Sequence, residues 1–256
     1  MKHYEELLDK GCFTWEDVCK MLGNPNTASN LIQNYLKKGY IKSVKRNLYV
    51  AVNLVDNMPV VSHFAIAGHI TPSAYVSHHS AFSYYGYTNQ VFYDVYVSSA
   101  SRFNSFEFDG RTYRYVMSRI DEGVEKKADG VTVTDLERTI IDGINDFEKI
   151  GGLEELLRSL SVIPYADESK LLRYLEKYRK QVLYQKAGYI LEHFKKDMKL
   201  SDGFFEQCSS RLSESVRYLH RGLNKDNAQY NRRWQLFASR DLLSVLSEGG
   251  DEFAGI

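Results

Sequence analysis

The chain has 256 residues, of which 43% are hydrophobic and 26% are charged, the ordinary composition of a globular protein with one large or two small domains. Its 33 basic and 33 acidic residues give a formal net charge of zero. The N-terminus has no apolar segment behind a basic region, no apolar run is long enough to span a bilayer, and the three cysteines form no paired framework. We therefore expect a cytoplasmic protein that does not associate with membranes.

The net charge of zero is a sum over unlike segments. Residues 1–52 carry +3, residues 53–169 carry −8, residues 170–240 carry +9, and the last sixteen residues add four acids and no bases. No Asp or Glu occurs from Val18 to Val55, where the average content would place about five. Six Lys and Arg lie in this acid-free stretch, and such a one-signed stretch is expected of a surface that meets phosphates.

Three short helices and a hairpin are predicted over residues 4–52. Apolar residues at helical spacing indicate helices that start near residue 4, at residue 14 and after the turn at residues 23–26. Thr14 and Asp17 have the spacing of a capping box at the start of the second helix. Strand-like runs at 40–44 and 48–52 flank the polar tripeptide 45–47, which indicates a hairpin with a basic tip.

This order of elements is typical of a winged helix-turn-helix, in which the second helix of the pair enters the major groove and the wing contacts the DNA backbone or the minor groove. The third helix presents Asn, Gln and Lys side chains opposite its apolar stripe. Asn and Gln pair with adenine edges, and Lys reaches guanine or phosphate. The predicted DNA-binding residues are Asn26, Thr27, Ser29, Asn30, Gln33, Asn34, Lys37, Lys38, Lys42, Lys45, Arg46 and Asn47. The alternative is a small helical domain with a solvated polar face.

The rest of the chain is predicted to combine a sheet with helices. A helix at 77–85, strands at 93–97 and 131–133, and a hairpin around Asp109-Gly110 precede a helix whose capping box is formed by Thr134 and Glu137. Apolar stripes then indicate helices at 153–160, 171–182 and 187–194. The predicted fold class is α+β, with a winged helix-turn-helix at 1–55 and a mixed α/β C-terminal domain at 56–256. That domain is sheet-bearing at 56–146 and mainly helical at 147–256.

Three groups of polar residues are candidates for catalytic sites. The pair His78-His79 is interpreted as packed, because neither a nucleophile turn nor a second cluster of ligands accompanies it. Arg138 and Asp142 are interpreted as a surface or half-buried ion pair at i, i+4. A metal-dependent nuclease needs a carboxylate on one strand and an acid-x-Lys sequence on the next. Asp94 could supply the first carboxylate, but the segment 107–109 lacks the lysine. We predict no catalytic residue, no metal ligand, no cofactor and no enzyme activity.

Several motifs resemble the AbiEi family, the antitoxins of abortive-infection toxin–antitoxin systems of type IV. They are Y-V-S-H-H-S-A-F-S-Y-Y-G-Y at 75–87, V-T-V-T-D-L-E-R-T-I-I-D at 131–142, G-G-L-E-E at 151–155 and G-Y-I-L-E at 188–192. The resemblance implies a repressor that binds double-stranded operator repeats upstream of its own operon. It also implies that the C-terminal domain neutralises a cognate nucleotidyltransferase toxin without a stable complex.

Two other functions stay open at this stage. One is a winged-helix protein with a nuclease-like C-terminal domain. The other is a DNA-binding interaction module with no antitoxin role, whose acidic middle segment docks a basic partner. In the basic segment 170–240, Tyr218, Tyr230 and Trp234 are interspersed with Lys and Arg. This composition fits a surface for nucleic acid or for an acidic protein partner. It fits equally well a solvated helical face or a face that meets the acidic middle segment.

Overall fold

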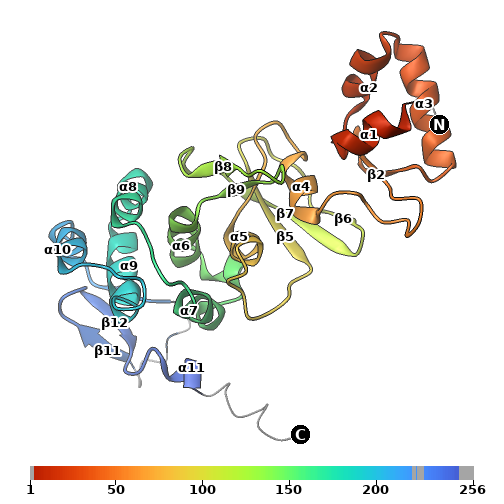
Figure 1. Ribbon diagram of the computed structural model, residues 1–256. Helices are drawn as coiled ribbons and strands as arrows, with labels where there is room; N and C mark the ends of the chain where they lie inside the picture. Colours follow the sequence, from red (N-terminus) through yellow and green to blue (C-terminus); the bar gives the residue numbers. More distant parts are fainter. Residues whose placement is uncertain (1–2, 221–222, 224–227, 248–256) are drawn as a thin grey trace, which may run out of the picture. The chain divides into compact units, whose positions relative to one another are not determined.

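The computed structural model describes residues 3–220, 223 and 228–247 and has a mixed α+β fold with three sheets (Figure 1). Contacts divide the chain into two compact units. The first unit comprises residues 1–76, 92–118 and 125–133, and the second comprises 77–91, 119–124 and 134–256. Each unit thus consists of three separate segments of the chain. The predicted domains, 1–55 and 56–256, are continuous segments, and their boundary stays a prediction.

The first unit begins with three helices and a small sheet, which we call the N-terminal module (residues 3–52). Its elements are α1 (Tyr4–Lys10), β1 (Cys12–Phe13), α2 (Trp15–Leu22), α3 (Pro25–Lys37), β2 (Ile41–Lys45) and β3 (Leu48–Ala51). The strands pair antiparallel in the order β1-β3-β2. Leu7, Val18 and Ile32 are among the buried residues that join the helices into one core. The three helices and the hairpin predicted for this region are thus present.

Local sequence explains where these helices begin. The Thr14 hydroxyl accepts a hydrogen bond from Asp17 N, and the Asp17 carboxylate accepts one from Thr14 N, so the predicted capping box of α2 is confirmed. The Asn24 side chain caps α3 by accepting from the backbone N–H groups of residues 26 and 27. Pro25, at the first position of α3, needs no hydrogen-bond partner for its nitrogen.

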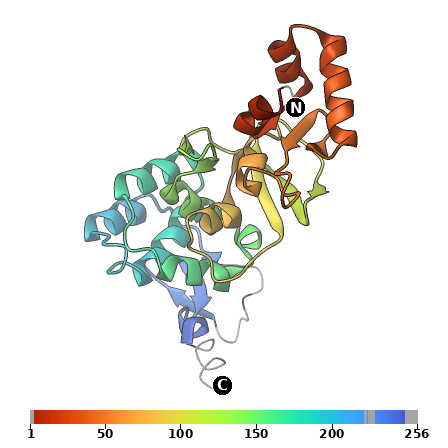
Figure 2. The same cartoon turned by 45° about the vertical axis from the view of Figure 1, so that its right-hand side comes forward.

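A six-stranded sheet and the helix α4 (His63–Gly68) form the rest of the first unit. The strands are β4 (Tyr75–Val76), β5 (Asp94–Ser99), β6 (Phe106–Phe108), β7 (Arg111–Met117), β8 (Val124–Lys126) and β9 (Thr132–Thr134). The strand order is β6-β7-β5-β4-β9-β8, and Figure 2 shows α4 against the yellow strand β5. Asp109 and Gly110 both have positive φ, as the predicted type I′ turn between β6 and β7 requires.

The second unit is mainly helical and packs around α6 (Leu136–Asn145), in which Ile140, Ile141 and Ile144 are fully buried. Its other helices are α5 (His78–Tyr84), the 3-10 helix η1 (Phe147–Ile150), α7 (Leu153–Ser161), α8 (Glu168–Tyr178), α9 (Gln181–His193), α10 (Asp202–Ser210) and α11 (Ser244–Ser247). The three helices predicted from apolar stripes correspond to α7, α8 and α9.

A three-stranded sheet near the end of the second unit was not predicted. It consists of β10 (Arg217–Tyr218), β11 (Ala228–Asn231) and β12 (Leu236–Ser239), in the order β10-β12-β11. Trp234, which is fully buried, fits against α9 where Gly188 leaves room for its ring. A Cβ atom at Gly188 would lie 2.0 Å from that ring, so the missing side chain lets the sheet segment pack against the helix.

Replacing Gly188 by Ala should therefore lower the free energy of unfolding by about 1–3 kcal/mol, because the added methyl group overpacks the contact with Trp234. Gly203→Ala in α10 is the matched control, since a Cβ there meets only ordinary contacts. Its gain in helix propensity should raise the stability by up to about 1 kcal/mol. Urea denaturation of the two variants measures the difference, and equal stabilities would contradict this account of Gly188.

Candidate functional site

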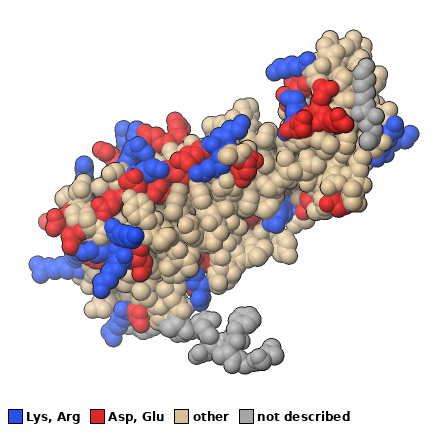
Figure 3. Space-filling view, in the orientation of Figure 1, with Lys and Arg blue, Asp and Glu red and all other residues tan. Residues whose placement is uncertain are grey.

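The exposed face of α3 is the candidate functional surface of the N-terminal module. The buried residues Ala28, Ile32 and Tyr35 anchor the opposite face of this helix in the core. The predicted site residues that the structure leaves exposed on or just after α3 are Asn26, Thr27, Asn30, Gln33, Asn34, Lys37 and Lys38. α3 itself contains no Asp or Glu, so the acidic side chains seen on the N-terminal module in Figure 3 belong to other elements. The helix therefore offers amide and ammonium groups to a partner without a repelling carboxylate of its own.

Ser29 and Asn47, two other predicted site residues, hold this surface together. Ser29 is half-buried, and its hydroxyl accepts a hydrogen bond of 3.0 Å from the Trp15 indole, which joins α3 to α2. The Asn47 amide oxygen accepts a bond of 3.0 Å from Trp15 N, and its amide nitrogen donates to the Glu16 carboxylate at 2.7 Å. The hairpin turn is thereby fastened to the start of α2.

The two lysines predicted to bind phosphate from the hairpin make contacts inside the first unit. The Lys42 ammonium donates to the Asn57 carbonyl at 2.6 Å and lies 3.9 Å from the Asp109 carboxylate. The Lys45 ammonium donates to the Ile70 carbonyl at 2.9 Å and lies 5.8 Å from the centre of the Phe103 ring. Burial lowers the pKa of Lys45. Both lysines are half-buried, whereas Arg46 at the turn is exposed.

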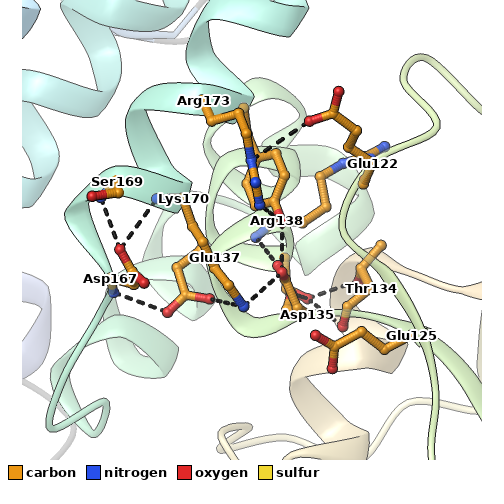
Figure 4. Close-up of polar contacts among 12 residues, drawn as sticks. Glu122, Glu125, Thr134, Asp135, Glu137, Arg138, Asp167, Ser169, Lys170 and Arg173 are labelled. Atoms are coloured by element: carbon orange, nitrogen blue, oxygen red, sulfur yellow. Dashed lines mark hydrogen bonds and ion pairs between the residues drawn. The ribbon is translucent and has the colours of Figure 1, made fainter.

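The start of α6 carries a second cluster of polar residues, from the D-L-E-R-T motif (Figure 4). The predicted capping box of Thr134 and Glu137 is wrong, because Thr134 is the last residue of β9 and the cap falls on the following residue. Asp135 caps the helix by accepting from Arg138 N at 2.8 Å. Its other carboxylate oxygen accepts from the Tyr174 hydroxyl at 2.5 Å and lies 3.1 Å from the Lys170 ammonium.

Glu137 has a different partner from the one predicted. Its carboxylate accepts a hydrogen bond of 2.9 Å from Asp167 N and lies 3.6 Å from the Lys170 ammonium. Asp167 is the N-cap of α8, so Glu137 fastens the start of α8 to α6. Sequence spacing did not reveal this role, because the partner lies 30 residues away along the chain.

Arg138 and Asp142 form the predicted i, i+4 pair, with 2.8 Å between guanidinium and carboxylate. The expected surface or half-buried position is wrong, since both side chains are only 1% exposed. The guanidinium also donates to the carbonyls of Ile120 and Glu122, and the Tyr178 hydroxyl donates to Asp142. A buried charge needs such partners on every side. The pair therefore organises the interior of the second unit.

The side chains of the His78-His79 pair are buried. His78 Nδ1 lies 2.9 Å from the Ser77 hydroxyl, and burial lowers the pKa of His78. His79 Nε2 lies 3.7 Å from the carboxylate of Glu155, and both of these side chains are 2% exposed. These positions favour the predicted packing role over catalysis at the surface.

Asp94, the residue considered for metal-dependent nuclease chemistry, does not belong to a metal site in the part of the chain that the structure describes. Asp94, on β5, pairs with Arg114 on the neighbouring strand β7. In the part of the chain that the structure describes, no three or more His, Cys, Asp or Glu side chains are placed to share a metal ion. The same part contains no helix whose length and apolar character would suffice to cross a membrane.

Comparison with known proteins identifies a shared fold. No protein-family model and no curated protein matches the chain. The crystal structure of the RV2827C protein from Mycobacterium tuberculosis is similar, with a TM-score of 0.63 over 96% of this chain and 92% of that chain. The sequences are 13% identical over this match. The likeness therefore concerns the arrangement of helices and strands over nearly the whole chain.

Replacing Arg138 by Met should lower the free energy of unfolding by about 3–5 kcal/mol, because Asp142 would stay buried without its guanidinium partner. Arg158→Met is the matched control, since Arg158 also pairs with an acid at i−4, but the Glu154 side chain of that pair is 57% exposed. That variant should lose about 0.5 kcal/mol or less. Chemical denaturation of both variants would contradict the buried-pair account if the two losses were similar.

Proposed function

We propose that the N-terminal module is a winged helix-turn-helix that binds double-stranded DNA, and that the protein represses its own operon and acts as the antitoxin of a nucleotidyltransferase toxin. The observation that carries the DNA-binding part is the acid-free, amide-rich face of α3, which is exposed and backed by a buried core. Residues on such a face meet base edges when the helix lies in the major groove.

Geometry supports α3 as the recognition helix. Its 13 residues give a length of about 20 Å, enough to lie along the major groove. Asn26, Asn30 and Gln33 follow one another at helical spacing and all are exposed. The contacts from Trp15 to Ser29 and Asn47 fix α3 and the hairpin relative to α2. A reading surface held in place in this way loses little conformational freedom on binding.

We assign phosphate contacts to the basic residues whose side chains are exposed, and this set differs from the one predicted from the sequence. Lys37, Lys38 and Arg46 are exposed, and we assign them to the DNA backbone. Lys42 and Lys45 already donate to backbone carbonyls of the first unit, so we assign them a structural role. Only residues 46 and 47 separate β2 from β3, and so short a wing suits a backbone contact better than insertion into the minor groove.

The antitoxin part of the proposal rests on the resemblance to the AbiEi family. Its motif at 131–142 supplies Asp135, Glu137, Arg138 and Asp142, whose contacts join α6 to α8 and to residues 120–122. The motif thus has a structural purpose in the second unit, which fits a family that shares a C-terminal fold without a shared catalytic centre. The proposed function needs no catalysis and no cofactor.

The salt dependence of DNA binding tests the phosphate contacts. Lys37→Ala and Arg46→Ala should each weaken binding to every duplex and reduce the slope of log K against log salt by about one. Lys45→Ala should leave this slope unchanged, because its ammonium is bound to the Ile70 carbonyl. Fluorescence anisotropy with a labelled duplex from the upstream region, at several salt concentrations, measures all three variants. An equal loss of slope in Lys45→Ala would show that the hairpin lysines contact DNA after all.

Base-edge contacts are tested by sequence preference. Asn30→Ala and Gln33→Ala should relax discrimination at one base pair each, by about 1–3 kcal/mol, while the salt slope stays the same. Competition between the operator and operators changed at single base pairs measures this effect. If both variants kept the discrimination of the unchanged protein, α3 would not be the recognition helix.

Neutralisation is tested separately from DNA binding. Expression of the protein should restore growth to cells that express the nucleotidyltransferase encoded beside it. The double variant Asn30→Ala, Gln33→Ala should restore growth equally well, because neutralisation is assigned to the C-terminal domain. Growth arrest that persists in the presence of the folded protein would remove the antitoxin role and leave the DNA-binding proposal standing.

A further inference from the structure

Three aromatic side chains lie in a row across the small sheet of the second unit. Tyr218 of β10 and Tyr230 of β11 are both register partners of Phe237, on the central strand β12. The ring centres of Tyr218 and Phe237 are 5.1 Å apart with the planes 19° from parallel, and those of Tyr230 and Phe237 are 5.3 Å apart at 49°. We call Tyr218, Phe237 and Tyr230 the aromatic row.

The aromatic row lies on the outer face of its sheet. Along β12, Leu236 and Ala238 are buried, and alternation along a strand places Phe237 on the opposite face. Tyr218 is 47% exposed and Tyr230 is 42% exposed. Trp234, the other large aromatic residue of this segment, is fully buried and supplies the packing that the sheet needs. The aromatic row is therefore not part of the core, and part of the surface of its rings is open to solvent.

The stretch of sequence that contains the aromatic row is basic. Residues 216–240 contain six Lys and Arg and a single Asp, and Asp241 follows them. Arg217, Arg232 and Arg240 are exposed. Arg233, in contrast, pairs with the Glu192 carboxylate, which also accepts from the Trp234 indole, so the charge of this acid is paired within the protein. The local charge favours an anionic ligand.

A hollow of about 340 Å³ lies beside the row, between α9 and the edge strand β11. Tyr230 and Arg240 both line it, together with Gln229, His193 and Glu192, whose carboxylate is paired with Arg233. Ligand pockets in proteins begin near this volume. A flat ring that stacks on Tyr230 would thus find hydrogen-bonding groups and a guanidinium at its edge.

We propose that the aromatic row binds unpaired bases of a single-stranded nucleic acid, with Arg232 and Arg240 contacting its phosphates. Bases stack on exposed aromatic rings whatever their sequence, and basic residues follow the backbone. A duplex does not suit this surface, because its bases already stack on one another and present only their edges. The site lies in the second unit and is distinct from the duplex-reading surface assigned to α3.

Binding of labelled 12-nucleotide single strands by the full-length protein tests the proposal. The probes are oligo(U), oligo(dT) and an abasic strand with the same number of phosphates. Tyr218→Ala and Tyr230→Ala should each weaken binding of the first two by roughly 5- to 100-fold and leave the weaker abasic binding unchanged. Tyr218→Trp and Tyr230→Trp should keep the affinity, because the stacking surface remains. A preference between oligo(U) and oligo(dT) identifies which strand the row binds.

Matched controls separate this site from other effects. Tyr165→Ala removes a tyrosine of the second unit that is 55% exposed and should leave binding unchanged. The variant Asn30→Ala, Gln33→Ala should also bind single strands normally, whereas Tyr218→Ala should bind the operator duplex normally. Circular dichroism verifies that each variant is folded. The proposal is overturned if folded Tyr218→Ala and Tyr230→Ala bind oligo(U) and oligo(dT) as tightly as the unchanged protein, or if neither strand binds at low salt.

Discussion

The buried guanidinium of Arg138 is the constraint around which the second unit is organised. A charge taken out of water is tolerated only when hydrogen-bond partners surround it. Arg138 finds them in Asp142, on its own helix, and in the carbonyls of Ile120 and Glu122, which come from a separate segment of the chain. The Tyr178 hydroxyl completes the arrangement from α8. Because these partners come from α6, from α8 and from residues 120–122, the buried charge is satisfied only when these three segments are assembled together.

The N-terminal module solves a different problem, which is to hold polar side chains in place at a surface. Its helices share a small core, and directed hydrogen bonds add to their fixed orientation. Trp15 is central to them, since its indole bonds to Ser29 and its backbone nitrogen bonds to Asn47. Residues that sequence reasoning assigned to DNA thereby serve the geometry of the module. The side chains left exposed beside them are the ones suited to recognition.

The features that follow from the sequence are those whose controlling interactions are local. The capping box at Thr14, the turn at Asp109-Gly110 and the amphipathic helices all depend on residues within a few positions of one another. The contacts that do not follow from it have a partner that is distant along the chain. The Lys45 ammonium bonds to a carbonyl 25 residues away, and the Glu137 carboxylate to an N–H group 30 residues away. Charge and helical period give no information on such partners.

The candidate surface shows the same division. Exposure of the α3 face followed from the apolar stripe on its other side, which is a local pattern. The contacts of the hairpin lysines could not be predicted in this way, because their partners at residues 57, 70, 103 and 109 are distant along the chain. The small C-terminal sheet was missed since its strands have only two to four residues, too few for alternation to be distinguished from a helical period.

The way the chain is shared between the two units has a consequence for synthesis on the ribosome. All segments of the first unit have been translated once residue 133 is made, whereas the core of the second unit includes Trp234 and Leu242. About 100 further residues must be added before Trp234 reaches its place beside Gly188, which takes roughly 5–20 s at ordinary rates of translation. During that interval the N-terminal module can be folded while residues 77–91 wait for the helices that cover them. A nascent chain thus completes the exposed face of α3, to which we assign DNA binding, before its second unit is complete.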